Sequence, residues 1–212
     1  MMKHILILCN GDPPSKQLFL SAFSACDYFI AADGGGNIAR DFGQTPDVVI
    51  GDLDSFESRS DDTFEVVFDP DQYSNDLEKA LQLALKKQGT HVQVLGATGK
   101  RLDHTLKNLS VLKQFDNQFE EIVFKDNFGD TFLIPRRFAI DLPPGTPVSL
   151  FPLSGRVNGI TTSGLKYPLK NEPLENGVHD GSSNEVIESP VEITHQTDDL
   201  LIFIAKKITQ SR

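Results

Sequence analysis

The sequence DYFIAADGGGNIARDFGQTPDVVIGDLDS, residues 27–55, contains two short apolar runs, and each is followed at once by glycine and aspartate. These runs are too short for buried helices and are apolar throughout, so they predict strands over 27–33 and 47–54 that are covered on both faces. A short helix fits between them, near 38–42. A strand, a helix and a strand in succession predict two parallel neighbours in one sheet, with acidic and small residues at their carboxyl ends.

The same alternation extends through the first two-thirds of the chain. Apolar runs predict strands at 4–9, 65–68 and 91–96, and a terminal pair of strands at EIVFKD (121–126) and TFLIP (131–135). Helices are expected from Ser15, as a cap, through Phe23, and over 76–88 and 103–115. The apolar stripe of the last helix is predicted at Leu102, Leu106, Leu109 and Leu112. The fold class predicted is therefore α/β, with a mainly parallel, Rossmann-like sheet and helices on both faces.

The pattern changes near Pro135, beyond which prolines are frequent and no stretch has a helical period. Short strand-like runs follow at residues 138–142, 147–153, 157–164, 183–188, 191–195 and 200–208. Runs of this kind predict a small all-β sandwich. We therefore expect two domains, an α/β domain over 1–135 and a β-sandwich over 136–212.

The chain is acidic, with a formal net charge of −10, and the acidity is concentrated. Residues 27–76 contain 13 acids and only two bases, Arg40 and Arg59. Because nucleic-acid binding depends on neutralising phosphates with a basic face, this composition argues against a nucleic-acid partner. No apolar run is long enough for a membrane helix. The two cysteines, Cys9 and Cys26, lie in apolar surroundings and predict buried thiols in a cytoplasmic protein.

The motif GDLDS, residues 51–55, carries the clearest chemical signal. On an extended segment, Asp52 and Asp54 would point to the same side with Cα atoms roughly 6.6 Å apart. Paired carboxylates at the carboxyl end of a strand suit Mg²⁺, which takes a few carboxylate oxygens together with water and substrate phosphates. The alternative is an ordinary acidic turn.

Three further motifs lie at predicted strand or helix ends. In ADGGGN (32–37), Gly34 and Gly35 would let the backbone approach a phosphate closely, although neither a dinucleotide nor a Walker spacing is present. In GATGKRLDHTLKN (96–108), Gly99, Lys100 and Arg101 precede a helix whose start suits a polyphosphate, and His104 and Asn108 share one face. A capped, solvent-exposed helix start is the alternative. Tyr167, after a Gly-Leu-Lys turn, is either an aromatic platform for a flat ligand or an ordinary strand residue.

Together these motifs resemble the thiamine pyrophosphokinase family. The resemblance rests on ADGG (32–35), PDVVIGDLDS (46–55), Gln72 and Asp76 before LEKAL, GATGKRLDH (96–104) with Asn108, TTSGLKYPL (161–169) and SSN (182–184). These segments occur in this order over nearly the whole chain, on an α/β half followed by a β half.

The resemblance implies transfer of a pyrophosphoryl group from ATP to the hydroxyl of thiamine, with Mg²⁺ as cofactor. It also implies a homodimer whose active site lies between the α/β domain of one subunit and the sandwich of the other. Asp52, Asp54 and Asp76 correspond to the metal-binding and catalytic carboxylates, and Asp103 or Asp76 to the group that orients or deprotonates the hydroxyl. Residues that correspond to the ATP and thiamine pockets are Asp33, Gln72, Arg101, Asp103, Tyr167, Ser183 and Asn184.

Two other kinds of protein stay open at this point. One is a different Mg²⁺-dependent enzyme, such as a nucleotide phosphohydrolase, which would act without thiamine. The other is a non-catalytic nucleotide-sensing module, for which the acidic pair would be surplus. This sequence also departs from the family at two positions: it has Tyr167 where Trp is common, and Asn75 where Thr is common before the acid.

Overall fold

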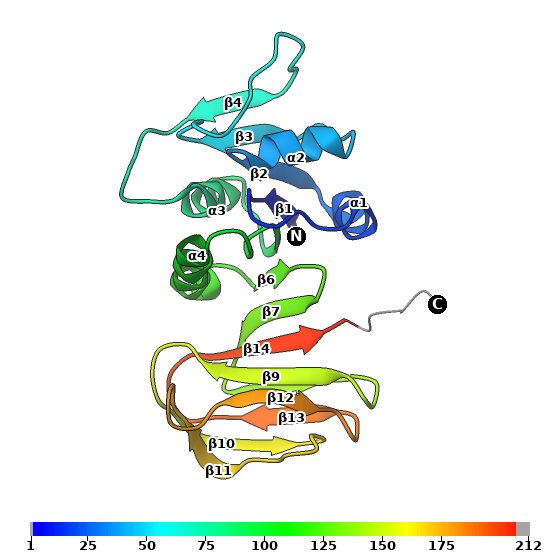
Figure 1. Cartoon of the computed structure of the whole chain (residues 1–212), viewed down its shortest axis with the longest axis vertical. Helices are drawn as coiled ribbons and strands as arrows, with labels where there is room; N and C mark the ends of the chain where they lie inside the picture. Colours follow the sequence, from blue (N-terminus) through cyan, green and yellow to red (C-terminus); the bar gives the residue numbers. More distant parts are fainter. Residues whose placement is uncertain (1, 207–212) are drawn as a thin grey trace. The chain divides into compact units, whose positions relative to one another are not determined.

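The computed structural model describes residues 2–206, which form two compact units that divide between Asn127 and Phe128 (Figure 1). The predicted boundary near 135 is therefore one strand too late. Strand β7 (Gly129–Ile134) pairs antiparallel with β14 (Leu200–Ala205) along its whole length, so its hydrogen bonds place it in the second unit. TFLIP, expected to close the first domain, thus opens the second.

The first unit contains a parallel sheet in the order β6-β5-β1-β2-β3-β4. Its strands are β1 (His4–Leu8), β2 (Tyr28–Ala32), β3 (Val48–Gly51), β4 (Glu65–Phe68), β5 (His91–Leu95) and β6 (Glu121–Lys125). The chain builds outward from β1 to β4 and then crosses back to β5, on the other side of β1. This reversal puts a crevice at the carboxyl end of β1, where open sheets of this kind bind ligands.

Four α-helices connect these strands: α1 (Lys16–Ala25), α2 (Gly35–Asp41), α3 (Asp76–Lys86) and α4 (Leu102–Phe115), followed by the 3₁₀ turn η1 (Asp116–Gln118). Ser15 caps α1 as predicted, because its side chain accepts the Leu18 N–H. Helix α2 begins at Gly35, three residues before the predicted start, so the glycine cluster is itself helical rather than a loop.

The helices cover both faces of the sheet (Figure 1). Leu6 and Leu8 of β1 pack with Phe19 of α1 and Ala39 of α2. Ile5 points to the opposite face, where it lies against Gly89, just after α3. This burial of alternate β1 side chains on two sides explains why the strand is apolar throughout.

The predicted apolar stripe of α4 is partly wrong. Leu102 and Leu106 are 71% and 58% exposed, whereas the helix buries Asn108, Val111, Leu112 and Phe115. The first turns of α4 border a pocket, to which Arg101, His104 and Asn108 contribute, and only the later turns pack against apolar neighbours.

The second unit is a sandwich of two antiparallel sheets, ordered β12-β9-β14-β7 and β11-β10-β13-β8. The remaining strands are β8 (Arg137–Ile140), β9 (Pro147–Pro152), β10 (Val157–Ser163), β11 (Lys170–Leu174), β12 (Gly181–Glu185) and β13 (Val191–Thr194). One apolar core joins the two sheets, with Leu150, Ile160, Ile193 and Ile202 among its members. The end of the last predicted strand, 207–208, lies outside the described residues. No helix between residues 2 and 206 has the length and apolar character needed to cross a bilayer.

Candidate active site

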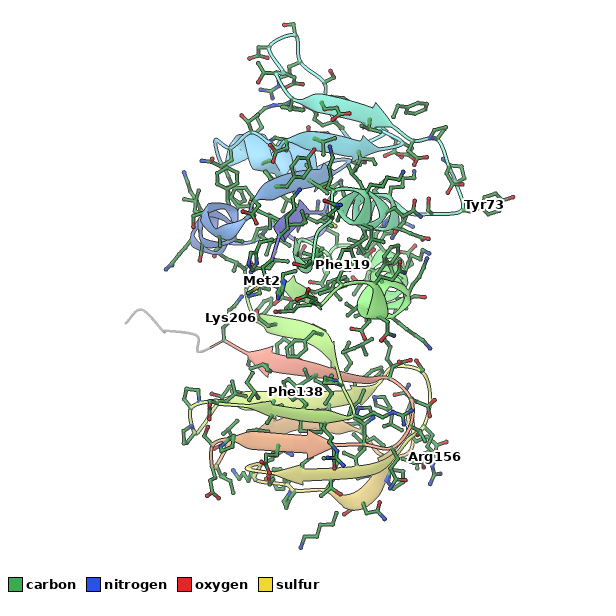
Figure 2. The ribbon with its side chains drawn as sticks, turned by 180° about the vertical axis from the view of Figure 1, so that it is seen from behind. Met2, Tyr73, Phe119, Phe138, Arg156 and Lys206 are labelled. Atoms are coloured by element: carbon green, nitrogen blue, oxygen red, sulfur yellow. The ribbon has the colours of Figure 1, made fainter. Side chains whose placement is uncertain are left out.

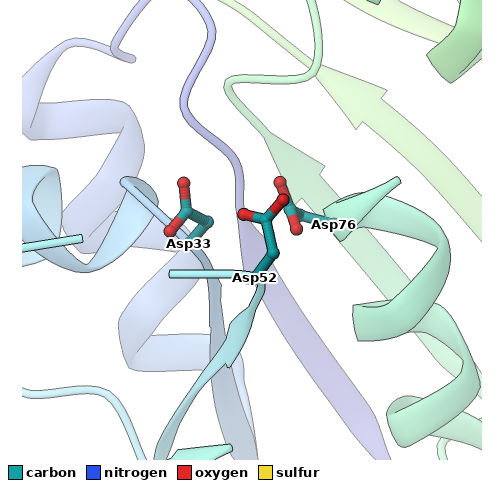
Figure 3. A group of neighbouring side chains, drawn as sticks. All are labelled: Asp33, Asp52 and Asp76. Carbon is teal, nitrogen blue, oxygen red and sulfur yellow. The ribbon is translucent and has the colours of Figure 1, made fainter. Parts of the chain in front are cut away.

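Three carboxylates meet at the carboxyl ends of the first unit's strands. Asp33 follows β2, Asp52 follows β3 and Asp76 opens α3, and one oxygen from each lies within 4.8 Å of the others. Figure 3 shows the three side chains pointing toward one another from three separate segments. Carboxylate oxygens gathered in this way are the ligands that a hard divalent cation prefers.

The backbone fixes Asp33 in the cluster. Its carboxylate accepts the N–H groups of Ser55 and Phe56, at 3.2 and 3.1 Å, and its own backbone has φ +45°. The residue is 3% exposed. Burial raises the pKa of Asp33, and the surrounding N–H groups partly offset the increase.

Asp76 is held by the start of α3. Asn75 caps the helix by accepting the Glu78 N–H at 3.0 Å, which directs the Asp76 side chain toward the other two carboxylates. Burial raises the pKa of Asp76, and the negative charges of Asp33 and Asp52 raise it further. The three groups therefore repel one another, and the arrangement calls for a positive charge.

A buried lysine supplies part of that charge. Lys79, one turn along α3, is 2% exposed, and its Nζ lies 3.7 Å from Asp76 Oδ1. The same ammonium donates to the Asp69 carbonyl oxygen at 2.8 Å. Three carboxylates and one ammonium leave a formal charge of −2, which one divalent cation would neutralise.

Gly51 makes the close approach possible. A Cβ at this position would lie 2.8 Å from Asp76 Oδ1 and 2.9 Å from the Asp33 Cβ. Since contacts under 3.0 Å are not tolerated, any side chain here would push the carboxylates apart. The glycine of GDLDS is therefore a requirement of the cluster.

The segment that carries Asp52 and Asp54 is not extended as predicted, because strand β3 ends at Gly51 and Leu53 adopts φ +60°. Asp54 is exposed and accepts the Ser55 hydroxyl at 2.9 Å. It borders the same pocket, but the third member of the cluster is Asp33.

The cluster forms one wall of a pocket of about 490 Å³. Ten predicted site residues line it: Asp33, Asp52, Asp54, Gln72, Asp76, Gly99, Lys100, Arg101, His104 and Asn108. Gly34, Gly35 and Asp103 do not. A Cβ on Gly35 would lie 2.0 Å from the Leu8 carbonyl oxygen, so this glycine serves the packing of α2 against β1 rather than an approach to a phosphate.

The loops after β1 and β5 are joined along the pocket. Gly11 N–H donates to the Gly96 carbonyl oxygen at 2.8 Å, and the Lys100 ammonium donates to Asn10 O and Oδ1 at 2.8 and 3.0 Å. Asn108 of α4 links the loop after β5 to the start of α3. Its amide nitrogen donates to Ala97 O, and its amide oxygen accepts from Asn75, both at 2.7 Å. Two predicted binding residues, Lys100 and Asn108, thus also build the pocket wall.

Arg101 and Asp103 form an exposed ion pair at the start of α4. The Arg101 guanidinium lowers the pKa of Asp103, whose carboxylate also accepts the His104 N–H. The direction of this pKa shift is opposite to that of Asp33 and Asp76, whose pKa values burial raises.

The predicted residues of the second unit form a small cluster of their own. Tyr167 N–H donates to Asn184 Oδ1 at 3.0 Å, and the Asn184 amide donates back to Tyr167 O at 2.8 Å. Ser183 has φ +59°, and its N–H donates to Ser149 Oγ at 3.0 Å. Tyr167 is 63% exposed, and the Lys166 ammonium lies over its ring at 5.8 Å from the centroid.

Sequence reasoning missed several residues of the pocket, chief among them Lys79. A lysine on an amphipathic helix is expected to face water, and only its spacing of three from Asp76 could have indicated the pair. Asp71 and Ser74 also line the pocket from the loop before α3, and Figure 2 shows the intervening Tyr73 projecting outward.

Comparison with known proteins identifies the family. A model described as "Thiamin pyrophosphokinase, catalytic domain" matches residues 19–124, and one described as "Thiamin pyrophosphokinase, vitamin B1 binding domain" matches 133–200. The chain belongs to the thiamine pyrophosphokinase family. Enzymes of this family transfer pyrophosphate from ATP to thiamine.

Curated family members are similar over most of their length. The thiamine pyrophosphokinase of Bacillus subtilis is 31% identical over 89% of this chain and 92% of its own. Thiamin pyrophosphokinase 1 of Caenorhabditis elegans is 28% identical over 88% of this chain and 83% of its own.

Solved structures of thiamine pyrophosphokinases share the fold. That of B. subtilis has a TM-score of 0.83 at 24% identity and covers 97% of this chain and 100% of its own. That of Candida albicans has a TM-score of 0.83 at 19% identity, over 96% of this chain and 89% of its own. The mixed α/β architecture with an additional antiparallel sheet is therefore that of the family.

Proposed function

We propose that this chain transfers the pyrophosphoryl group of ATP to the hydroxyl of thiamine, giving thiamine diphosphate and AMP. The observation that carries the proposal is the meeting of Asp33, Asp52 and Asp76 in a pocket at the carboxyl ends of the strands, in a chain of this family. The Rossmann-like description of the first unit belongs to the same proposal, as does a cytoplasmic location, which two free thiols favour.

Asp33, Asp52 and Asp76 would hold Mg²⁺. The donor set fits this ion, because it is all oxygen and its formal charge of −2, with Lys79 included, balances one divalent cation. When bound, Mg²⁺ would offset the phosphate charge that an acidic pocket otherwise repels. Asp54 lies at the exposed edge of the same pocket, outside this cluster.

The other wall supplies donors for the triphosphate. Gly99, Lys100 and Arg101 precede α4, and the Lys100 ammonium is already positioned by Asn10. Arg101 is exposed, so its guanidinium could leave the Asp103 carboxylate and bind a phosphate oxygen instead. We assign Gln72 and His104, on opposite parts of the pocket lining, to contacts with the nucleotide or thiamine.

In the reaction, the hydroxyl oxygen of thiamine forms a bond to the β-phosphorus of ATP. The bond from that phosphorus to the oxygen bridging to the α-phosphate breaks, and AMP leaves with the electron pair. The hydroxyl proton passes to a carboxylate. The two candidates for this role are Asp103 and Asp76. Arg101 lowers the pKa of Asp103, and Asp76 could take the proton only through an oxygen that the ion does not bind.

Thiamine would lie against Tyr167, Ser183 and Asn184 of a partner subunit in a homodimer. The Tyr167 ring offers a face for a flat or cationic heterocycle, and the Asn184 amide keeps the loop in shape through both its hydrogen bonds to Tyr167. Tyrosine presents a smaller face than the tryptophan common in the family, so weaker stacking is expected.

One assay tests the reaction. The protein is incubated with ATP and Mg²⁺, with and without thiamine, and AMP and thiamine diphosphate are followed. Equimolar production of both, only with thiamine, is the expected result. Release of phosphate or pyrophosphate without thiamine would instead indicate a phosphohydrolase, and ATP binding without turnover a sensing module.

The shared site is tested by mixing two inactive variants. Asp76→Asn removes a carboxylate of the first unit, and a Tyr167→Ala, Asn184→Ala double variant removes thiamine contacts of the second. A mixed dimer would contain one intact site, so activity is expected to reappear on mixing. Two variants that stay inactive after subunit exchange would argue that each site is built from one chain.

A further inference from the structure

The second unit has a pocket of its own, with a chemical character opposite to that of the first. It measures about 580 Å³ and is lined by Arg136, Arg137, Gly159, Thr161, Asn171, Thr194, His195 and Gln196. No aspartate or glutamate borders it. The pocket of the first unit, by comparison, is lined by five aspartates: Asp33, Asp52, Asp54, Asp71 and Asp76.

The positive charges of the two arginines in this pocket are not balanced by a carboxylate in its lining. Neither the Arg136 nor the Arg137 guanidinium makes a hydrogen bond or ion pair with any residue in 2–206, and both residues are exposed. Arg156 of the same unit shows the ordinary situation, since it donates to Glu175 at 3.0 Å. Two guanidinium groups that border one pocket without a carboxylate in its lining suit an anion.

The sheet places hydroxyl groups beside these arginines. Arg137 pairs directly with Thr194, and Thr194 pairs directly with Thr161, so the three residues form a row across β8, β13 and β10. Thr161 and Thr194 are exposed, whereas their chain neighbours Thr162 and Ile193 are buried in the sandwich. The row therefore lies on the outer face of this sheet.

Amide groups and backbone turns complete the pocket. Gly159 has φ +67°, and the Gln196 side chain lies so close to it that a Cβ would be 2.4 Å from the Gln196 Cδ. Gln196 extends from there toward Asn171, which has φ +58° and whose N–H donates to Thr161 Oγ1 at 3.1 Å. These positions keep two side-chain amides beside the threonine hydroxyls.

His195 supports the wall from behind. It is 7% exposed, and its ring nitrogens lie 3.2 and 3.3 Å from the carbonyl oxygens of Thr197 and Ile134. Its backbone N–H donates to Arg136 O at 3.1 Å, which fixes the chain at the point where the arginines emerge. The imidazole is thus engaged with the protein, and the arginines, hydroxyls and amides are the groups left for a ligand.

We propose that this pocket binds a small anion that carries phosphate groups. Guanidinium groups bind phosphate oxygens in a bidentate manner, and hydroxyl and amide donors satisfy the remaining oxygens of a tetrahedral group. The volume is in the range of ordinary small-ligand sites, with room for more than one phosphate. The proposal concerns different residues from the reaction and does not depend on it.

Calorimetric titration of the full chain with pyrophosphate in EDTA tests the proposal. Without a divalent cation the aspartates of the first pocket repel the anion, and the double variant below shows whether the binding that remains occurs in the arginine pocket rather than at Lys100 and Arg101. We expect one site per chain and a weakening of binding by at least tenfold in Arg136→Gln/Arg137→Gln. Each single variant, Arg136→Gln and Arg137→Gln, should also weaken binding, whereas Arg156→Gln, which removes one guanidinium elsewhere in this unit, should bind as the wild type does (Figure 2). Arg137→Lys should retain part of the affinity, because it keeps the charge but loses the bidentate geometry.

Parallel titrations with inorganic phosphate and AMP distinguish the possible sources of the phosphate group. Binding of all three, weakened by the double variant, supports the proposal, and the strongest ligand indicates the source. The proposal is overturned if pyrophosphate does not bind in EDTA, if the double variant binds it as the wild type does, or if only AMP binds. Circular dichroism of each variant verifies that the β-sandwich is intact, as expected for exposed arginines.

Discussion

Replacing Lys79 by methionine tests whether the carboxylate cluster is held together by its buried ammonium. At an effective dielectric constant near 20, charges 3.7 Å apart, the distance from Lys79 Nζ to Asp76 Oδ1, attract by about 4 kcal/mol. The variant also leaves the Asp69 carbonyl oxygen without its donor, which costs about 1–3 kcal/mol where water cannot replace it. About a third of the Asp76 side chain is exposed, so solvent screens part of the attraction.

We therefore expect Lys79→Met to lower the free energy of unfolding by about 3–5 kcal/mol in EDTA, the range found when one partner of a buried pair is removed. For a chain of this size, the melting temperature should fall by about 10 °C. Mg²⁺ should then raise it more in the variant than in the wild type, because the ion replaces the missing positive charge.

The measurement is a thermal melt of wild type and variant, in EDTA and across a Mg²⁺ series. Lys86→Met is the matched control, since Lys86 lies on the same helix but is exposed in its last turn. The reasoning is refuted if Lys79→Met melts within a degree or two of the control in EDTA, or if Mg²⁺ stabilises it no more than the wild type.

Four further outcomes are expected. Asp33→Asn should abolish the Mg²⁺-dependent rise in melting temperature, whereas Asp54→Asn should keep most of it; equal losses would restore the pairing expected from sequence. Gly51→Ala should weaken Mg²⁺ binding at least tenfold in a calorimetric titration while the chain stays folded, because its Cβ would separate the carboxylates; unchanged affinity would contradict this. Asn75→Ala should lower the free energy of unfolding by about 1–2 kcal/mol in urea through loss of the α3 cap, and no change would count against that cap. Burial raises the pKa of Cys26 to about 11, so its alkylation at pH 8 should be about a hundredfold slower than in the unfolded chain and should rise with pH through that value; equal rates would show an open thiol.

Most of the first unit could be predicted because its inner strands, such as β1, β2 and β3, are short apolar runs and because Ser15 caps α1. The residue pattern does not predict the structure where a neighbouring strand or an unusual backbone conformation determines it. Strand β11, KNEPL, carries charges and a proline and forms only because β10 pairs with it. Leu53 adopts a positive φ, which the residue pattern does not predict, and Asp33 joins Asp52 and Asp76 in the cluster.

In the candidate site, too, the residues that strand topology brings together could be predicted, and those placed by individual contacts could not. The motifs led to ten residues of one pocket, since strand ends converge by topology. They did not lead to Lys79, whose burial depends on the Asp69 carbonyl oxygen and on Asp76 across one helical turn. Asp103 was expected beside the reacting groups, yet Arg101 holds it at the exposed start of α4.

The three carboxylates come from three segments, after β2, after β3 and at the start of α3, and this dispersion affects local motion. A cation bound to all three would cross-link the start of α3 to the ends of β2 and β3, in addition to the hydrogen bonds that already join these two strands. Local opening of α3 would then require the ion to leave first. Amide hydrogens of α3 should therefore exchange with solvent more slowly as Mg²⁺ is added. Their exchange rate would then report how much of the site is occupied without any measurement of reaction product.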